Sequence, residues 1–239
     1  MKRTSLMRWY IPIYLTVLTL AVAAACISNQ AITTAAEGQP VPGRTCVIID
    51  AGHGGVDGGA TSCTGVLESG INLQIALRLE DLMHLLGYDT KMIRTTDISV
   101  YTDGSTIAQK KISDLKERVR MINTVENGLL VSIHQNQFPD SRYSGAQVFY
   151  AKAPDSELLA KQLQTSFVGT LNPGSRRLAK KSQGIYLMEH IQCTGILIEC
   201  GFLSNPQEEA LLRDPAYQKN LCSVIASNLC LYLDRQTVN

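Results

Sequence analysis

The chain has 239 residues, which is long enough for one sizeable domain with its own core. Hydrophobic residues make up 45% and charged residues 18%, so most of the chain is globular and not disordered. The formal net charge falls from +1 to −2 when the three positive charges of residues 1–26 are removed. Because no stripe of basic and aromatic residues is present either, the composition argues against a nucleic-acid partner.

The N-terminus has the pattern of an export segment. Residues 1–8 are basic, residues 9–26 carry no charge, and the apolar run ends in small residues. This pattern is typical of a secretory signal peptide or of a membrane anchor that is not cleaved, and it predicts an exported protein. Lipidation at Cys26 and a first helix of the folded domain are the alternatives. The small, polar and proline-containing residues 27–44 are expected to be a linker, and residues 45–239 are expected to form the folded domain.

From residue 45 onward, short apolar runs alternate with helical patterns. Strands are expected at 45–50, 89–94, 129–133, 146–150 and 195–199. Helices are expected at 69–86, 113–126, 155–171 and 215–233, with a short helix at 205–212 that begins at Asn205. Such alternation predicts an α/β fold, a mostly parallel twisted sheet flanked by helices, in one domain.

The seven cysteines form no CxxC pair, so a thiolate zinc ribbon is not expected. Cys46, Cys222 and Cys230 lie in apolar segments and are expected to be buried as small hydrophobic residues. Disulfides in an exported protein remain an alternative that the sequence does not resolve.

Four reactive side chains lie where predicted strands end or helices begin. His53 follows the first strand within the glycine-rich stretch GHGGVDGG, Glu68 opens the first helix, His134 follows LLVSI, and Glu199 ends GILIE. In an open α/β sheet, functional groups gather beyond the carboxyl ends of the strands. Two imidazoles and a carboxylate can bind zinc with a fourth position left for water. A second carboxylate must then take the proton of that water, and Glu199 is the candidate.

Each of these residues also has a structural interpretation when it is taken alone. A histidine after a strand is more often structural than a ligand, and Glu68 could be a helix N-terminal acid that the macrodipole favours. A phosphate-binding loop is a poor match for GHGGVDGG, since the stretch has neither the G-x-G-x-x-G spacing nor the Lys-Ser/Thr of a P-loop. Asp57 would also repel a phosphate.

Four segments resemble the signature blocks of the type 3, zinc-dependent N-acetylmuramoyl-L-alanine amidases. They are IIDAGHGGVDGGA, GVLESGINLQIALRL, LLVSIHQN and ILIECGFLSNPQEEALL, in the order of that family. The resemblance implies one Zn²⁺ per chain, with His53, Glu68 and His134 as ligands and Glu199 as the catalytic acid and base. The substrate it implies is the amide bond between N-acetylmuramic acid and L-alanine in peptidoglycan.

A closer likeness, in YSGAQVFYAKAP and SQGIYLMEHIQC, is to the germination-specific amidases of endospore formers. It implies action on spore cortex as the first step to muramic-δ-lactam, a location between the forespore membranes, and an activating lipoprotein partner. If the N-terminal segment is retained, the membrane is a further contact.

Further side chains are candidates for supporting roles. Asn136, Arg94 and Tyr186 are candidate substrate contacts, and Asp50 is a candidate to orient a ligand imidazole. Arg118 could meet a stem-peptide carboxylate or pair along its own helix. Two rival functions remain open: another zinc peptidoglycan peptidase, such as a carboxypeptidase, and a partner-dependent or non-catalytic wall-binding protein.

Overall fold

The computed structural model describes residues 44–237, so the predicted signal or anchor segment and all of the linker except Arg44 lie outside the described residues. A six-stranded sheet has the order β2-β1-β3-β6-β4-β5. Its strands are β1 (Cys46–Ala51), β2 (Thr90–Met92), β3 (Gly128–Asn136), β4 (Gln147–Tyr150), β5 (Lys180–Lys181) and β6 (Thr194–Phe202). β1, β2, β3 and β6 are mutually parallel, whereas β4 runs antiparallel to β6. The predicted mostly parallel α/β fold is confirmed.

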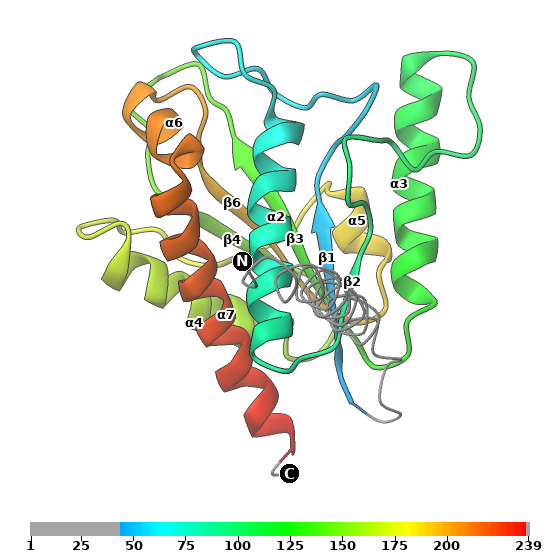
Figure 1. Cartoon of the computed structure of the whole chain (residues 1–239), viewed down its shortest axis with the longest axis vertical. Coiled ribbons are helices and arrows are strands. Elements are labelled where there is room, and N and C mark those ends of the chain that lie inside the picture. The colour runs from blue at the N-terminus through cyan, green and yellow to red at the C-terminus, as the bar shows by residue number, and fades with distance from the viewer. Residues whose placement is uncertain (1–43, 238–239) are drawn as a thin grey trace, which may run out of the picture. The chain divides into compact units, whose positions relative to one another are not determined.

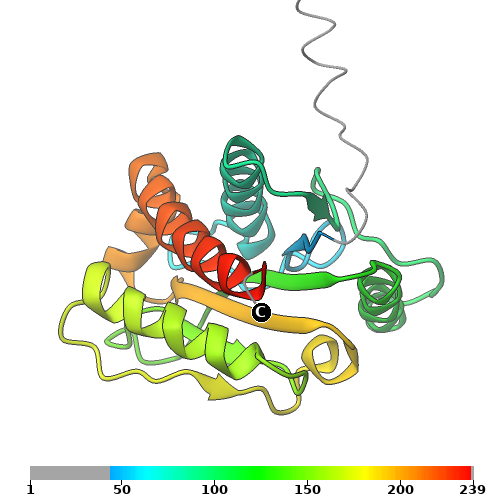
Figure 2. The ribbon, with the colours of Figure 1, turned by 90° about the horizontal axis from the view of Figure 1, so that it is seen from below.

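Helices cover both faces of the sheet. One face packs against α2 (Glu68–Leu85), α4 (Ser156–Thr170) and α7 (Pro215–Thr237), and the other against α3 (Ile107–Asn123) and α5 (Tyr186–His190). The short helix α6 (Pro206–Arg213) follows β6 and contacts α7. Figure 1 shows α2 and α7 in front of the sheet, and Figure 2 shows α3 and α5 on the side that lies away from α2. None of the helices within residues 44–237 has the length and apolar character that a membrane span needs.

The strands read as continuous apolar runs because both of their faces are buried. Along β1, Val47 and Ile49 face the α2 side, and Ile48 faces the α3 side. The same alternation continues in β3, where Leu130 faces α3, and in β6, where Leu197 does. Polar residues that follow these positions at spacings of two therefore lie on the α3 face of the sheet.

Several element boundaries differ from the prediction. β3 and β6 each run three residues further than expected, so His134 lies inside a strand and not after it, and Glu199 lies inside a strand and not at its end. The pairing of β3 with β6 continues there with a register shift between His134 and Asn136, although polar side chains interrupt the apolar pattern. α3 begins six residues early because Thr106 and Gln109 form a capping box. The short elements α5 and β5 were not predicted, and His190 ends α5.

The cysteines within residues 44–237 are all free thiols. Cys46, Cys200 and Cys222 are buried among apolar side chains, as predicted for the first and third of them. Cys230 is only half-buried. Disulfides among the described residues therefore play no part in this fold.

Candidate metal centre

His53, Glu68 and His134 come together at the carboxyl ends of the central strands. One potential ligand atom from each of them lies within 4.8 Å of the others. The Glu68 carboxylate stands between the two imidazoles, with Oε2 3.3 Å from His53 Nε2 and Oε1 3.1 Å from His134 Nδ1. Glu68 is buried, while the imidazoles are partly exposed. The donor set is thus open to a small ligand on the imidazole side.

Strand register places His134 beside Glu199. The two residues are direct partners in the parallel pairing of β3 and β6, and both continue the α3 face of the sheet. Adjacent strands lie about 4.8 Å apart, which sets the spacing between the two backbones. The relation is encoded by two buried strands and therefore does not depend on a flexible loop.

The glycines of the loop after β1 make room for the ligand side chains. A Cβ on Gly52 would lie 2.2 Å from the ring of His134, and a Cβ on Gly59 would lie 2.6 Å from Glu68 Oε2. His53 itself has φ 60°, in the left-handed region, and Gly54 and Asp57 exchange two backbone hydrogen bonds that close the turn. The loop is glycine-rich chiefly because the imidazoles and the carboxylate pack against its backbone.

Glu68 is held by a set of buried donors. Its carboxylate accepts hydrogen bonds from the backbone N–H groups of Ala60 and Gln135 and from Asn72 Nδ2. Burial alone would raise the pKa of Glu68, but its hydrogen bonds with His134 and His53 hold that pKa below its ordinary value. Asn72, four residues after Glu68 on α2, is fully buried and was missed by the sequence analysis. The i,i+4 spacing of the two residues was the available signal.

Asp57 is the carboxylate that contacts a ligand imidazole. Its Oδ2 lies 2.8 Å from His53 Nδ1, and its Oδ1 lies 2.7 Å from Lys111 Nζ on α3. Burial lowers the pKa of His53, but the hydrogen bonds to Asp57 and Glu68 outweigh burial and raise it to about 9. This contact fixes the ring so that Nε2 faces Glu68. The role was predicted for Asp50, whereas Asp57, which lies four residues after His53, was not predicted to have it.

We expect Asp57→Asn to weaken metal binding by about 10- to 100-fold, because the partner of the ligand imidazole loses its charge. Affinity for zinc would be measured by competition with a chelator above pH 9, where protons compete little for His53. Asp81→Asn, at an exposed position on α2, is the matched control. An affinity for zinc that is the same in Asp57→Asn as in the unmodified chain would contradict this role.

Glu199 projects into a cavity beside the three clustered side chains. Its Oε2 is buried without a hydrogen-bond partner among the described residues. Burial raises the pKa of Glu199, and the neighbouring Glu68 charge adds to that rise, against the opposing effect of His134 and His53. The cavity has a volume of about 360 Å³ and is lined on one side by Ile185, Leu187 and Leu197. An unpartnered carboxylate oxygen with a raised pKa can accept a proton from a molecule in this cavity.

Arg94 does not reach the surface, which corrects its assignment as a substrate contact. Its side chain is buried, and its guanidinium donates to the backbone oxygens of Ala51, Gly52, Ser69 and Thr96. Arg94 therefore ties the loop after β1 to the start of α2.

Asp50 is also corrected, since its carboxylate accepts hydrogen bonds from Arg118 and Ser132 and from no imidazole. Arg118 pairs with Asp114 along its own helix, as one of its two predicted roles required. Tyr186 opens α5 and stacks on His190, while its neighbours Ile185 and Leu187 line the cavity in its place. The backbone oxygen of Asn136 accepts from Leu203, and substrate contact by its side chain stays a prediction.

Comparison with known proteins decides the family. The family model described as N-acetylmuramoyl-L-alanine amidase (Amidase_3) matches residues 47–230. The chain belongs to this amidase family. It is 38% identical to the germination-specific N-acetylmuramoyl-L-alanine amidase of Bacillus subtilis (strain 168) over 195 residues, which are 81% of each chain.

Solved structures of family members have the same fold. The CwlD amidase from Clostridioides difficile, solved in complex with the GerS lipoprotein, superposes with a TM-score of 0.76 at 37% identity, over 80% of this chain and 99% of that one. An N-acetylmuramoyl-L-alanine amidase from Clostridium difficile 630 gives a TM-score of 0.70 at 30% identity, over 80% and 97% of the two chains. The expected family and fold are thereby confirmed.

Proposed function

We propose that this member of the amidase family is a zinc-dependent hydrolase of the amide bond between N-acetylmuramic acid and the L-alanine of the stem peptide. The observation that carries the proposal is the grouping of His53, Glu68 and His134 beside the unpartnered Glu199 carboxylate. The similarity to a germination-specific amidase supports spore cortex as the substrate, with cleavage as the first step to muramic-δ-lactam.

The three clustered side chains suit zinc. Two imidazoles and one carboxylate are the donor set of catalytic zinc sites that keep one position for water or substrate. Hard cations such as Mg²⁺ and Ca²⁺ prefer oxygen ligands alone, so two imidazoles disfavour them. When bound, zinc would supply Lewis acidity, which polarises the scissile carbonyl and acidifies water.

Glu199 carries the proton in the proposed reaction. Its Oε2 takes a proton from the attacking water as the water oxygen bonds to the lactyl carbonyl carbon. The bond between that carbon and the alanine nitrogen then breaks, and Glu199 returns the proton to the nitrogen. Burial raises the pKa of Glu199 towards neutral pH, so the carboxylate accepts and returns a proton more readily than an exposed carboxylate would.

The proposal is tested by digesting spore cortex and vegetative peptidoglycan with the purified full chain, whose zinc content is measured beforehand. Release of intact stem peptides, identified by mass, would support the amidase, and faster release from cortex would support the spore role. Release of single terminal amino acids would instead identify a carboxypeptidase. His134→Ala, which removes one ligand, is expected to lose both zinc and stem-peptide release.

We further propose that the protein acts outside the cytoplasm, between the forespore membranes, and that residues 1–26 export or anchor it. The structural relative solved with a lipoprotein supports an activating partner of that kind. A zinc-loaded chain that is inactive alone and becomes active when such a lipoprotein is added would support partner dependence.

A further inference from the structure

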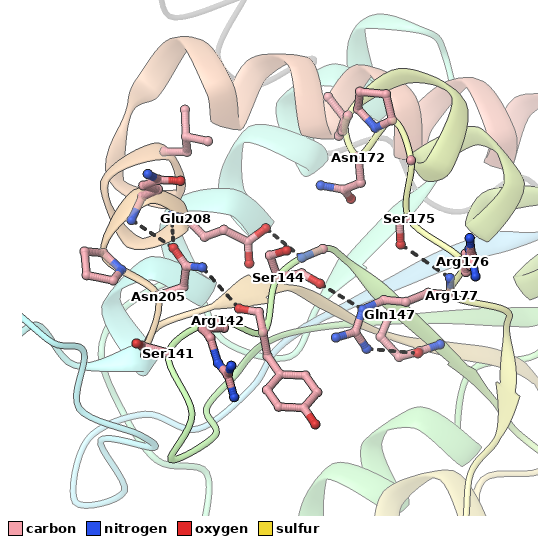
Figure 3. Close-up of a pocket in the computed structure, with 18 of the residues that line it drawn as sticks. Ser141, Arg142, Ser144, Gln147, Asn172, Ser175, Arg176, Arg177, Asn205 and Glu208 are labelled. Atoms are coloured by element: carbon pink, nitrogen blue, oxygen red, sulfur yellow. Dashed lines mark hydrogen bonds between the residues drawn. The ribbon is translucent and has the colours of Figure 1, made fainter.

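A second, larger hollow lies beyond the edge of the metal centre. It has a volume of about 1270 Å³ and is bordered by the segment 141–147, the segment 171–178 after α4, and the start of α6. Figure 3 shows Arg142, Arg176 and Arg177 at its wall, and Lys180 also lines it. We refer to this hollow, lined by these four cations, as the arginine groove.

The charge of the arginine groove is only partly neutralised from within. Glu208 is its one carboxylate among the described residues, and that side chain accepts the backbone N–H groups of Gly145 and Phe202 at 2.8 and 2.9 Å. Arg142 pairs with Asp140. Within residues 44–237, no ion pair within 4.0 Å is found for Arg176, Arg177 or Lys180. The groove therefore presents three cations without a carboxylate in direct contact, and the nearest carboxylate charge is that of Glu208, whose pKa burial raises and Arg177 lowers.

Arg177 is fixed in position, although no anion holds it. Its Nε donates to the backbone oxygen of Ser144 at 2.9 Å, and its guanidinium lies over the ring of Phe202, 4.9 Å from the ring centre. Its Nη1 lies 3.4 Å from Gln147 Oε1. These contacts, drawn in part in Figure 3, leave Nη2 without a partner among the described residues. A held planar guanidinium with a free N–H edge is suited to a carboxylate.

The groove lies one strand away from the proposed catalytic carboxylate. Gln147 in its wall is the direct partner of Glu199 in the antiparallel pairing of β4 and β6. Neighbouring strands lie about 4.8 Å apart, which places the Gln147 end of the groove close to the backbone of Glu199. Phe202, which supports Arg177, lies three residues after Glu199 on the same strand.

We propose that the arginine groove binds the free carboxylates of the stem peptide, on the peptide side of the bond that is cut. This inference rests on the proposed function. N-acetylated glycan is uncharged, apart from muramyl groups that lack a peptide, whereas stem peptides carry several carboxylates. Of the two, the peptide therefore complements the cations of the arginine groove. The carboxylate contacts expected of Arg94 and Arg118 thus fall to Arg176 and Arg177.

The test compares two soluble substrates with the full chain: a muramyl tripeptide with free carboxyl groups, and the same compound with each peptide carboxyl converted to a carboxamide. Unmodified protein is expected to show about a tenfold higher kcat/KM for the free acid, as one or two charge-assisted hydrogen bonds would give. Arg177→Gln and Arg176→Gln are each expected to reduce this preference severalfold, because each raises KM for the free acid more than KM for the carboxamide. Arg120→Gln, at an exposed position on α3, is the matched control.

Calorimetric binding of the free tripeptide separates the failure of this inference from that of the proposed function. Tripeptide binding that is lost in Arg177→Gln, without cleavage of either substrate, would support the groove and contradict the amidase. Cleavage of both substrates at equal kcat/KM by the unmodified chain would overturn the groove and keep the amidase. A groove variant that keeps the preference for the free acid but no longer binds a partner lipoprotein would make the groove a protein interface instead.

Discussion

Glu199→Gln is expected to reduce kcat for stem-peptide release by between about 10² and 10⁴, while the zinc content stays at that of the unmodified chain. The amide keeps the size of the side chain in its partly buried position on β6 but cannot accept a proton at the atom that corresponds to Oε2. Because Glu199 is not one of the three clustered side chains, loss of its charge leaves the donor set intact. The measurement is single-turnover release of stem peptide, with zinc quantified in the same samples.

A matched control distinguishes this effect from a general loss of negative charge. Glu126→Gln changes an exposed carboxylate between α3 and β3 and is expected to leave kcat unchanged. More than about a tenth of normal kcat in zinc-replete Glu199→Gln would show that another group carries the proton, since positioned general catalysis contributes at least about a hundredfold.

The fold could be predicted from the sequence because local signals and burial agree in this chain. β1 and the first parts of β3 and β6 are buried on both faces, so their apolar runs are unbroken. The carboxyl ends of β3 and β6 were not predicted, because their apolar runs are interrupted there. His134 and Glu199 occupy strand positions at the open end of the α3 face, where polar side chains replace apolar ones and remove the pattern that marks a strand.

The residues predicted to bind metal lie together, but several side chains that hydrogen-bond to them were not predicted. His53, Glu68 and His134 lie at strand and helix ends, and the topology of a parallel sheet brings such ends to one edge. The partners of these residues depend on loop conformation instead. Asp57 reaches His53 only because Gly54 and the left-handed backbone of His53 turn the chain back, and neither feature is visible in a residue pattern.

Arginines were the hardest side chains to assign. A long cationic side chain in an enzyme suggests substrate binding when only its position in the sequence is known. Arg94 instead satisfies four backbone carbonyl groups inside the molecule. Arg176 and Arg177 follow α4 in a segment with no helical or strand pattern, so nothing in the sequence indicated that they line a hollow next to β6.

Arg118→Met is expected to lower the free energy of unfolding by about 3–5 kcal/mol, the cost typical of removing one partner from a buried ion pair. Arg118 and Asp50 are 2% and 1% exposed, and Arg118 Nη1 donates to Asp50 Oδ1 at 2.5 Å. Methionine leaves that carboxylate with Ser132 as its one remaining side-chain donor in residues 44–237. The pKa of Asp50, which burial would raise but Arg118 and Ser132 hold low, should rise in the variant. Urea unfolding of the zinc-free chain measures the loss.

A double-mutant cycle tests whether the unpaired carboxylate causes the loss. Asp50→Leu combined with Arg118→Met removes both charges, so it should destabilise the chain by less than the sum of the two single changes. Full additivity would show that the two side chains act independently. Arg118 Nη2 also donates to the backbone oxygen of His53 at 2.7 Å. Methionine cannot hold the loop that carries His53, so Arg118→Met should also weaken zinc binding. The double variant should recover stability but not zinc affinity. Recovery of both properties together would show that Arg118 acts on the metal centre through fold stability alone.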